Sequence, residues 1–438
     1  MKRYEKYKDS GIEWIGEIPI HWEVKKLKYI ANANPSNIDK KSKEDEQDIF
    51  LCNYTDVYYN DFISSKIDFM KATASKSQID KFLLKKGDVI VTKDSETADD
   101  IGIPALVFED FDNVVCGYHL TQIKPISILG EYLFRNFQCK FLKSYFEVSS
   151  NGITRYGLGV DELNSSPIII PPLEEQIAIA NYLDQRTAEI DELIKQKVAL
   201  LLLFEEEKTA IINHAVTKGI DHNVKLKDSK IEWLGKIPEH WEVKKLKYVA
   251  NIVLGKMLTS EDKGEYFLKP YLRAANLNWL SANVDDVKEM WFSEKELVKY
   301  RIDNNDLLVS EGGEVGRTCI WKSEINECYI QNSVHKVTIN KNNDPAFFLY
   351  QFYSFGEKGS FDAIVNRISI AHLTVEKLKE ILFLVPTKEE QEQIVKFINS
   401  ESKRIEKKVD LALNLIELLK QYKTALISEV ATGKVKVI

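Results

Sequence analysis

One stretch of the sequence occurs twice, first near the start of the chain and again near its middle. Residues 9–31 and 228–250 are identical at 18 of 23 positions. A second, looser pair begins at Pro171 and Pro386 with the pattern Pro-x-x-Glu-Glu-Gln, and each copy runs on to a Lys-Thr-Ala sequence. A repeat of this kind indicates two homologous units of about half of the 438 residues each, so a single compact domain is ruled out.

The segments that follow the two prolines have the apolar spacing of long helices. Their seam residues lie alternately four and three positions apart, which is typical of a coiled coil: Ile190, Ile194, Lys197, Leu201, Phe204, Lys208, Ile211 and Ala215, and then Ile405, Val409, Ala412, Ile416, Leu419, Lys423, Leu426 and Val430. Glycines at 219 and 433 mark the predicted ends. Each helix is expected to have about 45 residues and a length on the order of 65 Å.

Two such helices in one chain can bury their apolar stripes against each other. An antiparallel pairing would put one globular insert at each end. The tail 431–438 also resembles residues 216–220, which lead into the second unit. We therefore expect adjacent termini and a pseudo-twofold axis across the helices.

The regions between the repeated segments differ in sequence but share a pattern of short strands. Alternating apolar runs between Gly, Asn and Asp predict strands at Asp48–Val57, Asp88–Thr92, Ala105–Phe108, Leu307–Ser310 and His335–Ile339, with helices around 129–146 and 345–356. The fold class is therefore α+β. Mixed α/β domains are predicted at 1–170 and 220–385, separated by antiparallel helical spacers at 171–219 and 386–438.

Composition narrows the class of function. The net charge of −7 argues mildly against a protein that coats nucleic acid, without excluding local basic patches. Five cysteines without a Cys-x-x-Cys pair argue against a disulfide framework and a zinc site. No apolar run approaches the roughly 20 residues that cross a bilayer, and the start lacks the apolar stretch of a signal peptide, so we expect a cytoplasmic protein. The phosphate-binding loop and metalloprotease patterns are missing from the sequence, which indicates that catalysis lies in other proteins.

The order of these features resembles the specificity subunit of type I restriction-modification systems. Shared phrases are Ile-Pro-x-x-Trp at 18–22 and 237–241, Leu-Arg-Ala-Ala-Asn at 272–276, Ser-Glu-Gly-Gly-Glu-Val-Gly-Arg at 310–317, and Asn-x-Ile at 151–153 and 366–368. The resemblance implies a non-catalytic subunit in which each variable domain is a target-recognition domain for one half of a bipartite double-stranded DNA target.

The resemblance also implies the partners of the chain. The paired helices would fix the spacing of the half-sites and dock two modification (methyltransferase) subunits, and restriction or motor subunits would complete the enzyme. S-adenosylmethionine, ATP and magnesium would be bound by those partners, with no cofactor or metal in this chain. The alternative is a pseudo-symmetric scaffold that bridges two partners without reading DNA, which the acidic net charge favours. A self-sufficient enzyme is disfavoured because the sequence contains no catalytic constellation.

Polar loop residues beside predicted strands are the candidate DNA-binding residues, because such side chains match base edges and phosphates. In the first half they are Asn53, Thr55, Thr92, Lys93, Ser95, Asn151, Thr154, Arg155 and Tyr156. In the second half they are Arg273, Asn276, Asn278, Ser310, Glu311, Gly313, Arg317, Asn366, Arg367, Ser369 and His372. For each one, a role in a solvated loop or turn is as common as a contact with DNA.

Two further groups belong to the repeated segments. The tryptophans at 14, 22, 233 and 241 predict a packed collar, within which His21 and His240 form hydrogen bonds. The candidate partner-binding residues are Glu175, Gln176, Glu390 and Gln391. Their position in the first turn of a helix is already explained by capping and by the helix dipole, and docking of a modification subunit is the additional hypothesis.

Overall fold

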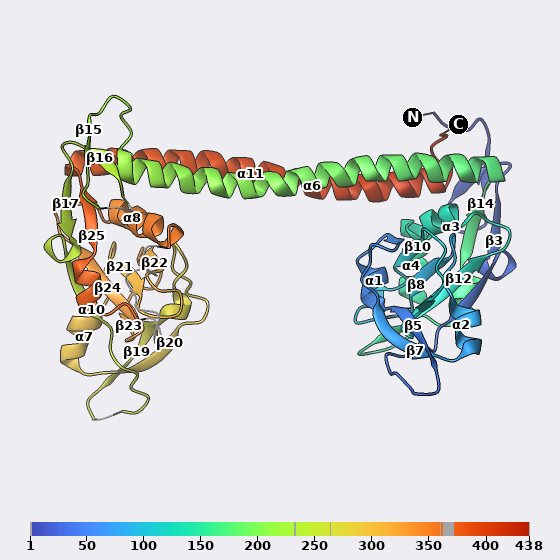
Figure 1. Ribbon diagram of the computed structural model, residues 1–438, viewed down its shortest axis with the longest axis horizontal. Coiled ribbons are helices and arrows are strands. Elements are labelled where there is room, and N and C mark those ends of the chain that lie inside the picture. The colour runs from blue at the N-terminus through green and yellow to red at the C-terminus, as the bar shows by residue number, and fades with distance from the viewer. Residues whose placement is uncertain (1, 232–233, 263, 360, 362–371, 438) are drawn as a thin grey trace. The chain divides into compact units, whose positions relative to one another are not determined.

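The computed structural model describes residues 2–231, 234–262, 264–359, 361 and 372–437 (Figure 1). The chain forms two compact units. Unit 1 contains Met1–Val198 together with Leu413–Ile438, and unit 2 contains Ala199–Ala412. Within the described ranges, no helix is both long enough and apolar enough to cross a membrane.

The elements follow the order expected for two mixed α/β regions. The helices are α1 Tyr54–Tyr58, α2 Lys76–Phe82, α3 Gly130–Phe137, α4 Lys140–Ser149, α5 Val160–Ser165, α6 Leu173–Lys218, α7 Glu294–Tyr300, α8 Pro345–Glu357, α10 Val375–Glu380 and α11 Lys388–Ala431. The strands of unit 1 are β1 Tyr7–Asp9, β2 Glu17–Pro19, β3 Glu23–Lys26, β4 Ala31–Pro35, β5 Gln47–Cys52, β6 Phe62–Ile63, β7 Met70–Ala74, β8 Val89–Thr92, β9 Asp94–Ser95, β10 Pro104–Val107, β11 Val114–Cys116, β12 Leu120–Pro125, β13 Tyr156–Gly157 and β14 Pro167–Ile170. Those of unit 2 are β15 Leu226–Asp228, β16 Lys236–Pro238, β17 Glu242–Lys245, β18 Ala250–Leu254, β19 Phe267–Leu272, β20 Lys288–Phe292, β21 Leu307–Ser310, β22 Thr318–Ile320, β23 Tyr329–Ile330, β24 Val334–Ile339 and β25 Leu382–Val385.

The two units share one sheet plan although their variable regions share little sequence. In unit 1 a sheet of order β4-β12-β8-β10-β6 stands beside a sheet of order β11-β5-β7. In unit 2 the corresponding orders are β18-β24-β21-β22 and β23-β19-β20. Strand directions also match. In unit 1, β11 is parallel to β5 and both neighbours of β8 are antiparallel to it. In unit 2, β23 is parallel to β19 and both neighbours of β21 are antiparallel to it. Apolar side chains between the layers form the cores of both units.

The repeated segments frame each variable region. In unit 1 the hairpin β1-β2 leads to β3, which pairs with β14 just before α6 begins. In unit 2 the hairpin β15-β16 leads to β17, which pairs with β25 just before α11 begins. The chain ends meet in unit 1, where Lys436 N donates to Lys2 O at 2.9 Å (Figure 1). The prediction of adjacent termini is therefore confirmed.

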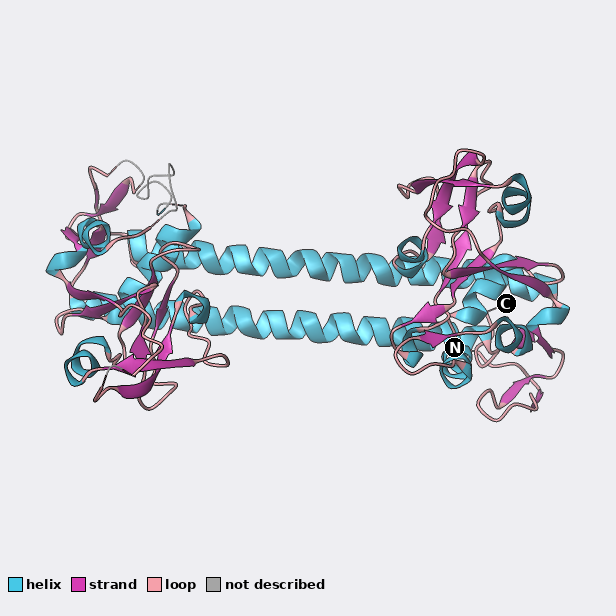
Figure 2. Cartoon of the chain, turned by 90° about the horizontal axis from the view of Figure 1, so that it is seen from below, coloured by secondary structure: helices cyan, strands magenta, loops and turns pink. Residues whose placement is uncertain are grey.

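Each unit contains one part of α6 packed beside one part of α11 (Figure 2). In unit 1, Lys423 Nζ lies 2.8 Å from an Asp191 carboxylate oxygen, and Ile190 and Leu426 belong to the core. In unit 2, Arg404 Nη2 lies 2.6 Å from Glu207 Oε1. The start of one helix lies near the end of the other in both units, so the predicted antiparallel packing is confirmed, and the predicted seam positions are buried or half-buried.

The structure corrects two details of the predicted elements. Residues 54–58 form α1 instead of continuing the strand predicted at Asp48–Val57, because Asn53 N donates to the Asp56 carboxylate at 2.7 Å and starts a helix. The helix predicted around 129–146 is divided into α3 and α4 at Gln138 and Cys139. The long helices end close to the predicted glycines, at Lys218 and Ala431.

Candidate nucleic-acid interface

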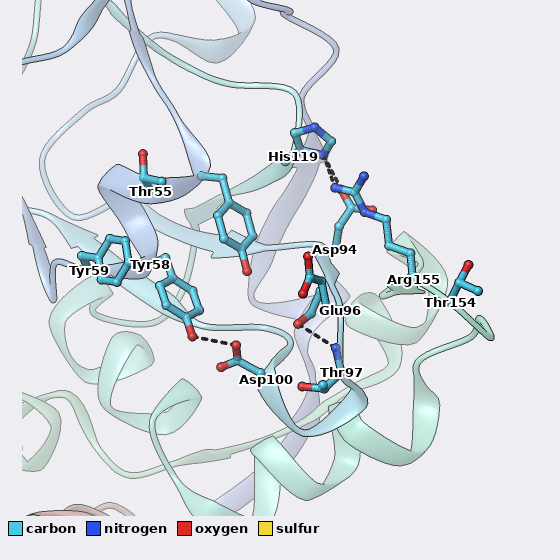
Figure 3. A pocket seen from close by; sticks show the side chains of 12 residues that line it. Thr55, Tyr58, Tyr59, Asp94, Glu96, Thr97, Asp100, His119, Thr154 and Arg155 are labelled. Carbon is cyan, nitrogen blue, oxygen red and sulfur yellow. Dashed lines mark hydrogen bonds and ion pairs between the residues drawn. The ribbon is translucent and has the colours of Figure 1, made fainter. Parts of the chain in front are cut away.

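Unit 1 has a hollow of about 600 Å³ at the carboxyl end of β8 (Figure 3). Residues from α1, β9, the turn after β11 and the loop before β13 line it: Tyr54, Thr55, Tyr58, Tyr59, Asp94, Ser95, Glu96, Thr97, Asp100, His119, Thr154 and Arg155. Four of the predicted residues, Thr55, Ser95, Thr154 and Arg155, therefore lie around one cavity. Hydroxyl, carboxylate, imidazole and guanidinium groups face the same space, which is the mixture of donors and acceptors that matches base edges.

The loop that carries Arg155 is closed by its own backbone. Gly157 and Asn151 exchange two backbone hydrogen bonds at 2.8 and 3.0 Å, and β13 pairs with β9. Gly152 has a φ of +148°, and a Cβ at this position would lie 1.9 Å from Arg155 O. Only glycine fits this tight loop. Asn151, predicted to contact DNA, therefore shapes the loop, and Tyr156 pairs with Ser95 in the short ladder.

Three side chains meet on one side of the hollow (Figure 3). His119 Nδ1 lies 2.6 Å from Asp94 Oδ2. Arg155 Nη2 lies 3.2 Å from the same imidazole nitrogen and 3.8 Å from Asp94 Oδ2. Because one nitrogen cannot both donate to the carboxylate and accept from the guanidinium, we assign Nδ1–H as the donor to Asp94, and Arg155 is held by the Asp94 charge.

The Tyr58 side chain lies across the hollow from this group (Figure 3), and Tyr54 also lines the hollow. The Tyr58 hydroxyl donates to Asp100 Oδ2 at 2.7 Å, and this hydrogen bond raises the pKa of Tyr58 to about 12. The Tyr54 ring stacks on the Tyr58 ring with centroids 5.5 Å apart. Burial raises the pKa of Tyr54. Both phenols are therefore neutral hydrogen-bonding groups at physiological pH.

A second hollow of about 300 Å³ adjoins the first and shares Tyr54, Thr55 and His119 with it. Asn53, another predicted residue, lines this second space. Thr92 is buried and Lys93 is half-buried. The Thr92 hydroxyl accepts from Ile103 N at 3.0 Å, and Lys93 Nζ donates to Ser36 O at 3.2 Å.

Burial lowers the pKa of Lys93. Its ammonium group lies 4.5 Å from the centre of the Tyr118 ring. Thr92 and Lys93 therefore support the strand and its turn, and a contact with DNA stays a prediction that this geometry does not favour.

The predicted residues of unit 2 lie on neighbouring loops. Arg317 donates to Ala274 O at 2.9 Å and to Glu314 Oε2 at 3.0 Å, so the loop after β21 is joined to the turn after β19. Arg273 pairs with Asp286. Leu373 N donates to Glu311 O at 2.8 Å, which brings exposed His372 to the same loop.

Other predicted residues of unit 2 have structural roles. Ser310 is buried and its hydroxyl donates to Gly312 O at 2.7 Å. The amide of buried Asn276 donates to Asn283 O at 3.1 Å. Gly313 has a φ of +72° at an exposed turn, and Asn278 is exposed. Asn366, Arg367 and Ser369 lie outside the described residues.

The predicted collar is present in unit 1, where Tyr4, His21 and Trp22 surround the Glu175 carboxylate in the first turn of α6. The buried Trp22 indole donates to Glu175 Oε2 at 3.0 Å, the Tyr4 hydroxyl donates to the same oxygen at 2.7 Å, and His21 Nε2 lies 2.6 Å from Oε1. Burial alone would raise the pKa of Glu175, but the hydrogen bonds from Tyr4, His21 and Trp22 together outweigh it and hold this pKa below its usual range. The carboxylate thus ties the repeated N-terminal segment to the first turn of α6.

Unit 2 repeats this arrangement with two donors. Trp241 Nε1 donates to Glu390 Oε1 at 2.9 Å, and His240 Nε2 lies 2.8 Å from Oε2. The prediction that both histidines form hydrogen bonds in the collar is confirmed. The prediction that Trp14 packs into the collar is wrong, because its side chain is exposed, and Trp233 lies outside the described residues.

The glutamines that follow these carboxylates are buried. Gln176 Oε1 accepts from Leu129 N at 2.8 Å, and Gln391 Oε1 accepts from Asp344 N at 2.8 Å. The four predicted partner-binding residues, Glu175, Gln176, Glu390 and Gln391, thus have partners inside their own units. Their docking role stays a prediction that this geometry does not favour.

Sequence reasoning missed several residues of the unit 1 hollow. Asp94 stands between the predicted Lys93 and Ser95 but is not itself among the predicted DNA-binding residues, in which Glu311 is the one carboxylate. His119 and Tyr58 are distant from the Asn151 loop in sequence, and only the fold brings them together. Within the described ranges, the His, Cys, Asp and Glu residues form no cluster that could hold a metal ion.

The same sheet plan is repeated in two units that each contain parts of two long packed helices, so the chain is a duplicated α+β protein. The family model "Type I restriction modification DNA specificity domain" matches residues 19–202 and 238–415, so the chain belongs to this family. It is the specificity subunit of a type I restriction-modification system, a non-catalytic component with two target-recognition domains. The predicted family, fold class and function are confirmed.

Individual proteins agree with this assignment. A protein of Methanocaldococcus jannaschii, provisionally named as the specificity subunit of type I restriction enzyme MjaX, is 25% identical over 97% of this chain and 96% of its own. The crystal structure of the HsdS subunit from Thermoanaerobacter tengcongensis has a TM-score of 0.57 at 16% identity, covering 95% of this chain and 98% of that one. A chain from a study of complex assembly and conformational transition of the type I system has a TM-score of 0.69 at 15% identity, covering 95% and 99%.

Proposed function

We propose that each unit contacts one half of a bipartite double-stranded DNA target. The observation that carries the proposal is the hollow of unit 1, where five predicted residues from three segments of the chain lie around two adjoining spaces: Asn53, Thr55, Ser95, Thr154 and Arg155. In unit 2 the predicted residues that are exposed or half-buried are Arg273, Asn278, Glu311, Gly313, Arg317 and His372, and we assign the DNA contacts of this unit to them. Because the two surfaces present different side chains on the same sheet plan, the two half-sites differ in sequence.

The same proposal assigns the remaining parts of the chain. Residues 1–170 and 220–385 are the functional target-recognition domains, and 171–219 and 386–438 are helical spacers that fix the separation of the half-sites. Two modification subunits bind the helices, and restriction subunits join them. S-adenosylmethionine, ATP and magnesium act in those partners, and the complex works in the cytoplasm.

The experiment that tests the function is a methylation map. The chain is co-expressed with its modification subunit in a host without adenine methylation, and methylated adenines are located by single-molecule sequencing. The expected motif is asymmetric and split by a fixed gap. Replacing residues 32–165 with those of another specificity subunit should change one half of the motif and leave the other half and the gap unchanged.

A scaffold that does not read DNA would give a different result. It would yield methylation at a motif that is unaffected by the replacement of 32–165, because the modification subunit alone would select the site. The matched control replaces residues 251–380, which end at the corresponding helix α10 and should change the other half only. Identical motifs from both replacements would contradict the proposal.

A further inference from the structure

Arg155 is the only arginine or lysine among the twelve residues that line the unit 1 hollow. Its side chain is 58% exposed, although the backbone on both sides is fixed by the Asn151–Gly157 closure and by the β9-β13 ladder. A solvent-accessible cation on a rigid loop is already placed for binding, so little ordering is needed when a ligand arrives.

The guanidinium is held from one side only. Asp94 and His119 lie near Nη2, at 3.8 and 3.2 Å respectively. Among the residues that the structure describes, Nε and Nη1 have no hydrogen-bond partner. The guanidinium therefore retains part of its planar fork of donors, which can bind two neighbouring acceptors at once.

The charged side chains near Arg155 indicate which part of DNA it contacts, a base or a phosphate. Asp94, Glu96 and Asp100 line the same hollow, and three carboxylates repel a phosphate group. A base edge is uncharged, so it avoids this repulsion. Among base edges in the major groove, guanine presents the adjacent acceptors O6 and N7 that fit an arginine fork, whereas adenine pairs one acceptor with one donor.

We propose that Arg155 reads a guanine in the half-site of unit 1, and that Asp94 and His119 are positioning residues for its guanidinium. The inference rests on the proposed function and adds the identity of one base and of the side chain that selects it. A carboxylate that faces the same hollow can also accept from a cytosine amino group, so the surface is suited to a G·C pair.

The test uses the full chain in complex with its modification subunit. The motif is first mapped as described above, and fluorescent duplexes are then made with each of the four bases at every position of the half-site that changes in the 32–165 replacement. Binding is measured by anisotropy at several salt concentrations. The ratio of affinities for G and for the other bases reports discrimination, and the slope of affinity against salt reports phosphate contacts.

Three substitutions of Arg155 give distinct expected results. With Arg155→Ala, discrimination for guanine at one position falls roughly 5- to 150-fold, the salt slope is unchanged and the other positions are unaffected. With Arg155→Gln, the preferred base at that position shifts toward adenine, which matches a glutamine amide. With Arg155→Lys, the charge is kept but the fork is lost, so discrimination is intermediate.

Two further variants complete the design. Lys86→Ala removes one positive charge before β8, at the strand end opposite the hollow, and should change neither discrimination nor salt slope. Asp94→Asn keeps the size of the positioning side chain and removes its charge, so discrimination at the same position falls while affinity for duplexes with other bases there is retained. A merely structural role of Asp94 would instead weaken all duplexes equally.

Two outcomes overturn the inference while the proposed function stands. One is an Arg155→Ala variant that ranks all duplexes as the unsubstituted chain does. The other is uniform weakening with a salt slope reduced by about one, which identifies a phosphate contact. Failure of the proposed function itself is distinguishable, since the mapped motif would then not respond to the 32–165 replacement.

Discussion

The collar carboxylates allow a quantitative comparison inside one chain. Glu175 accepts hydrogen bonds from three side chains, Tyr4, His21 and Trp22, whereas the equivalent Glu390 accepts from two among the described residues, His240 and Trp241. The side chain of Glu175 is 12% exposed and that of Glu390 is 22% exposed. Truncation of Glu175 to alanine should therefore destabilise its unit more than truncation of Glu390 destabilises the other.

The magnitude follows from what each truncation leaves behind. The buried Trp22 indole loses its acceptor, which costs about 1–3 kcal/mol, and a hydrogen bond to a charged group is worth about 1.5–3 kcal/mol. The His21 ring is exposed and can turn to water, so its loss adds little. We expect the free energy of unfolding to fall by about 3 kcal/mol with Glu175→Ala and by about 2 kcal/mol with Glu390→Ala. The effect of Glu390→Ala is smaller because Trp241 is as buried as Trp22 but Glu390 has no third donor among the described residues.

Hydrogen–deuterium exchange of the full chain measures both changes separately, because peptides that cover β2–β3 and β16–β17 report on different units. A loss of 3 kcal/mol corresponds to roughly 150-fold faster exchange where opening is global. The controls are Glu174→Ala and Glu389→Ala, which remove a neighbouring exposed carboxylate from the same first turn. Equal effects of Glu175→Ala and Glu174→Ala would refute the reasoning, because the cost would then come from the helix dipole alone.

The same carboxylate gives a pH dependence with a definite sign. The pKa of Glu175 is lower in the folded chain than its usual value of 4.5, because three hydrogen bonds together outweigh burial. Its contribution to stability is therefore fully present above the unfolded pKa and is lost as the pH falls through the folded pKa. The protection factor of the collar amides of unit 1, which is corrected for the intrinsic exchange rate, should decrease below about pH 4.5, and the difference between the unsubstituted chain and Glu175→Gln should shrink there.

Three further predictions concern unit stability. Asp184→Ala should destabilise unit 1 by about 2 kcal/mol in urea unfolding, because it leaves the Arg135 guanidinium, which is 1% exposed, without its ionic partner. The cost is below that of a fully buried pair because Asp184 is 41% exposed. An effect no larger than that of substituting an exposed aspartate would contradict the prediction. Glu207→Gln removes the charge that pairs with Arg404 in unit 2 and should leave the thermal midpoint unchanged within error in 0.5 M salt, because the Debye length is then about 4 Å and solvent-exposed ion pairs contribute little. A clear drop in the midpoint would contradict this. Gly152→Ala should open the loop that the Asn151–Gly157 hydrogen bonds close, because a Cβ at residue 152 would lie 1.9 Å from Arg155 O. The amides of this loop should then exchange hydrogen for deuterium faster while the remainder of unit 1 is unchanged. An unchanged exchange rate of the loop would contradict the prediction.

The sequence predicted the frame of the fold because the frame is encoded locally and twice. The seam of α6 and α11 and the collar histidines follow from short patterns whose partners are set by the repeat. The helix α1 was missed because its apolar residues also fit a strand. The pair Asn53 and Asp56 was the local signal that could have identified it.

The candidate site was predicted less completely, for a physical reason. Loop residues such as Thr55 and Arg155 were chosen one by one from polarity, whereas a hollow exists only when the strand order brings their loops together. His119 and Asp94 meet Arg155 through β9, β13 and the turn after β11, and no local pattern encodes this meeting. Burial of Thr92, Asn276 and Ser310 likewise depends on the sheets that cover them.

Unit 1 is built from two stretches that lie far apart in the sequence, and this affects how the chain folds during translation. Unit 2 is one uninterrupted stretch, whereas unit 1 needs Leu413–Ile438, the part translated last. Until that part leaves the ribosome, Trp22 lacks the neighbouring Gly433 backbone and Tyr7 lacks its acceptor, Gly433 O. The domain that is translated first is therefore completed last, and its unfinished apolar face is the surface that a nascent-chain chaperone would encounter.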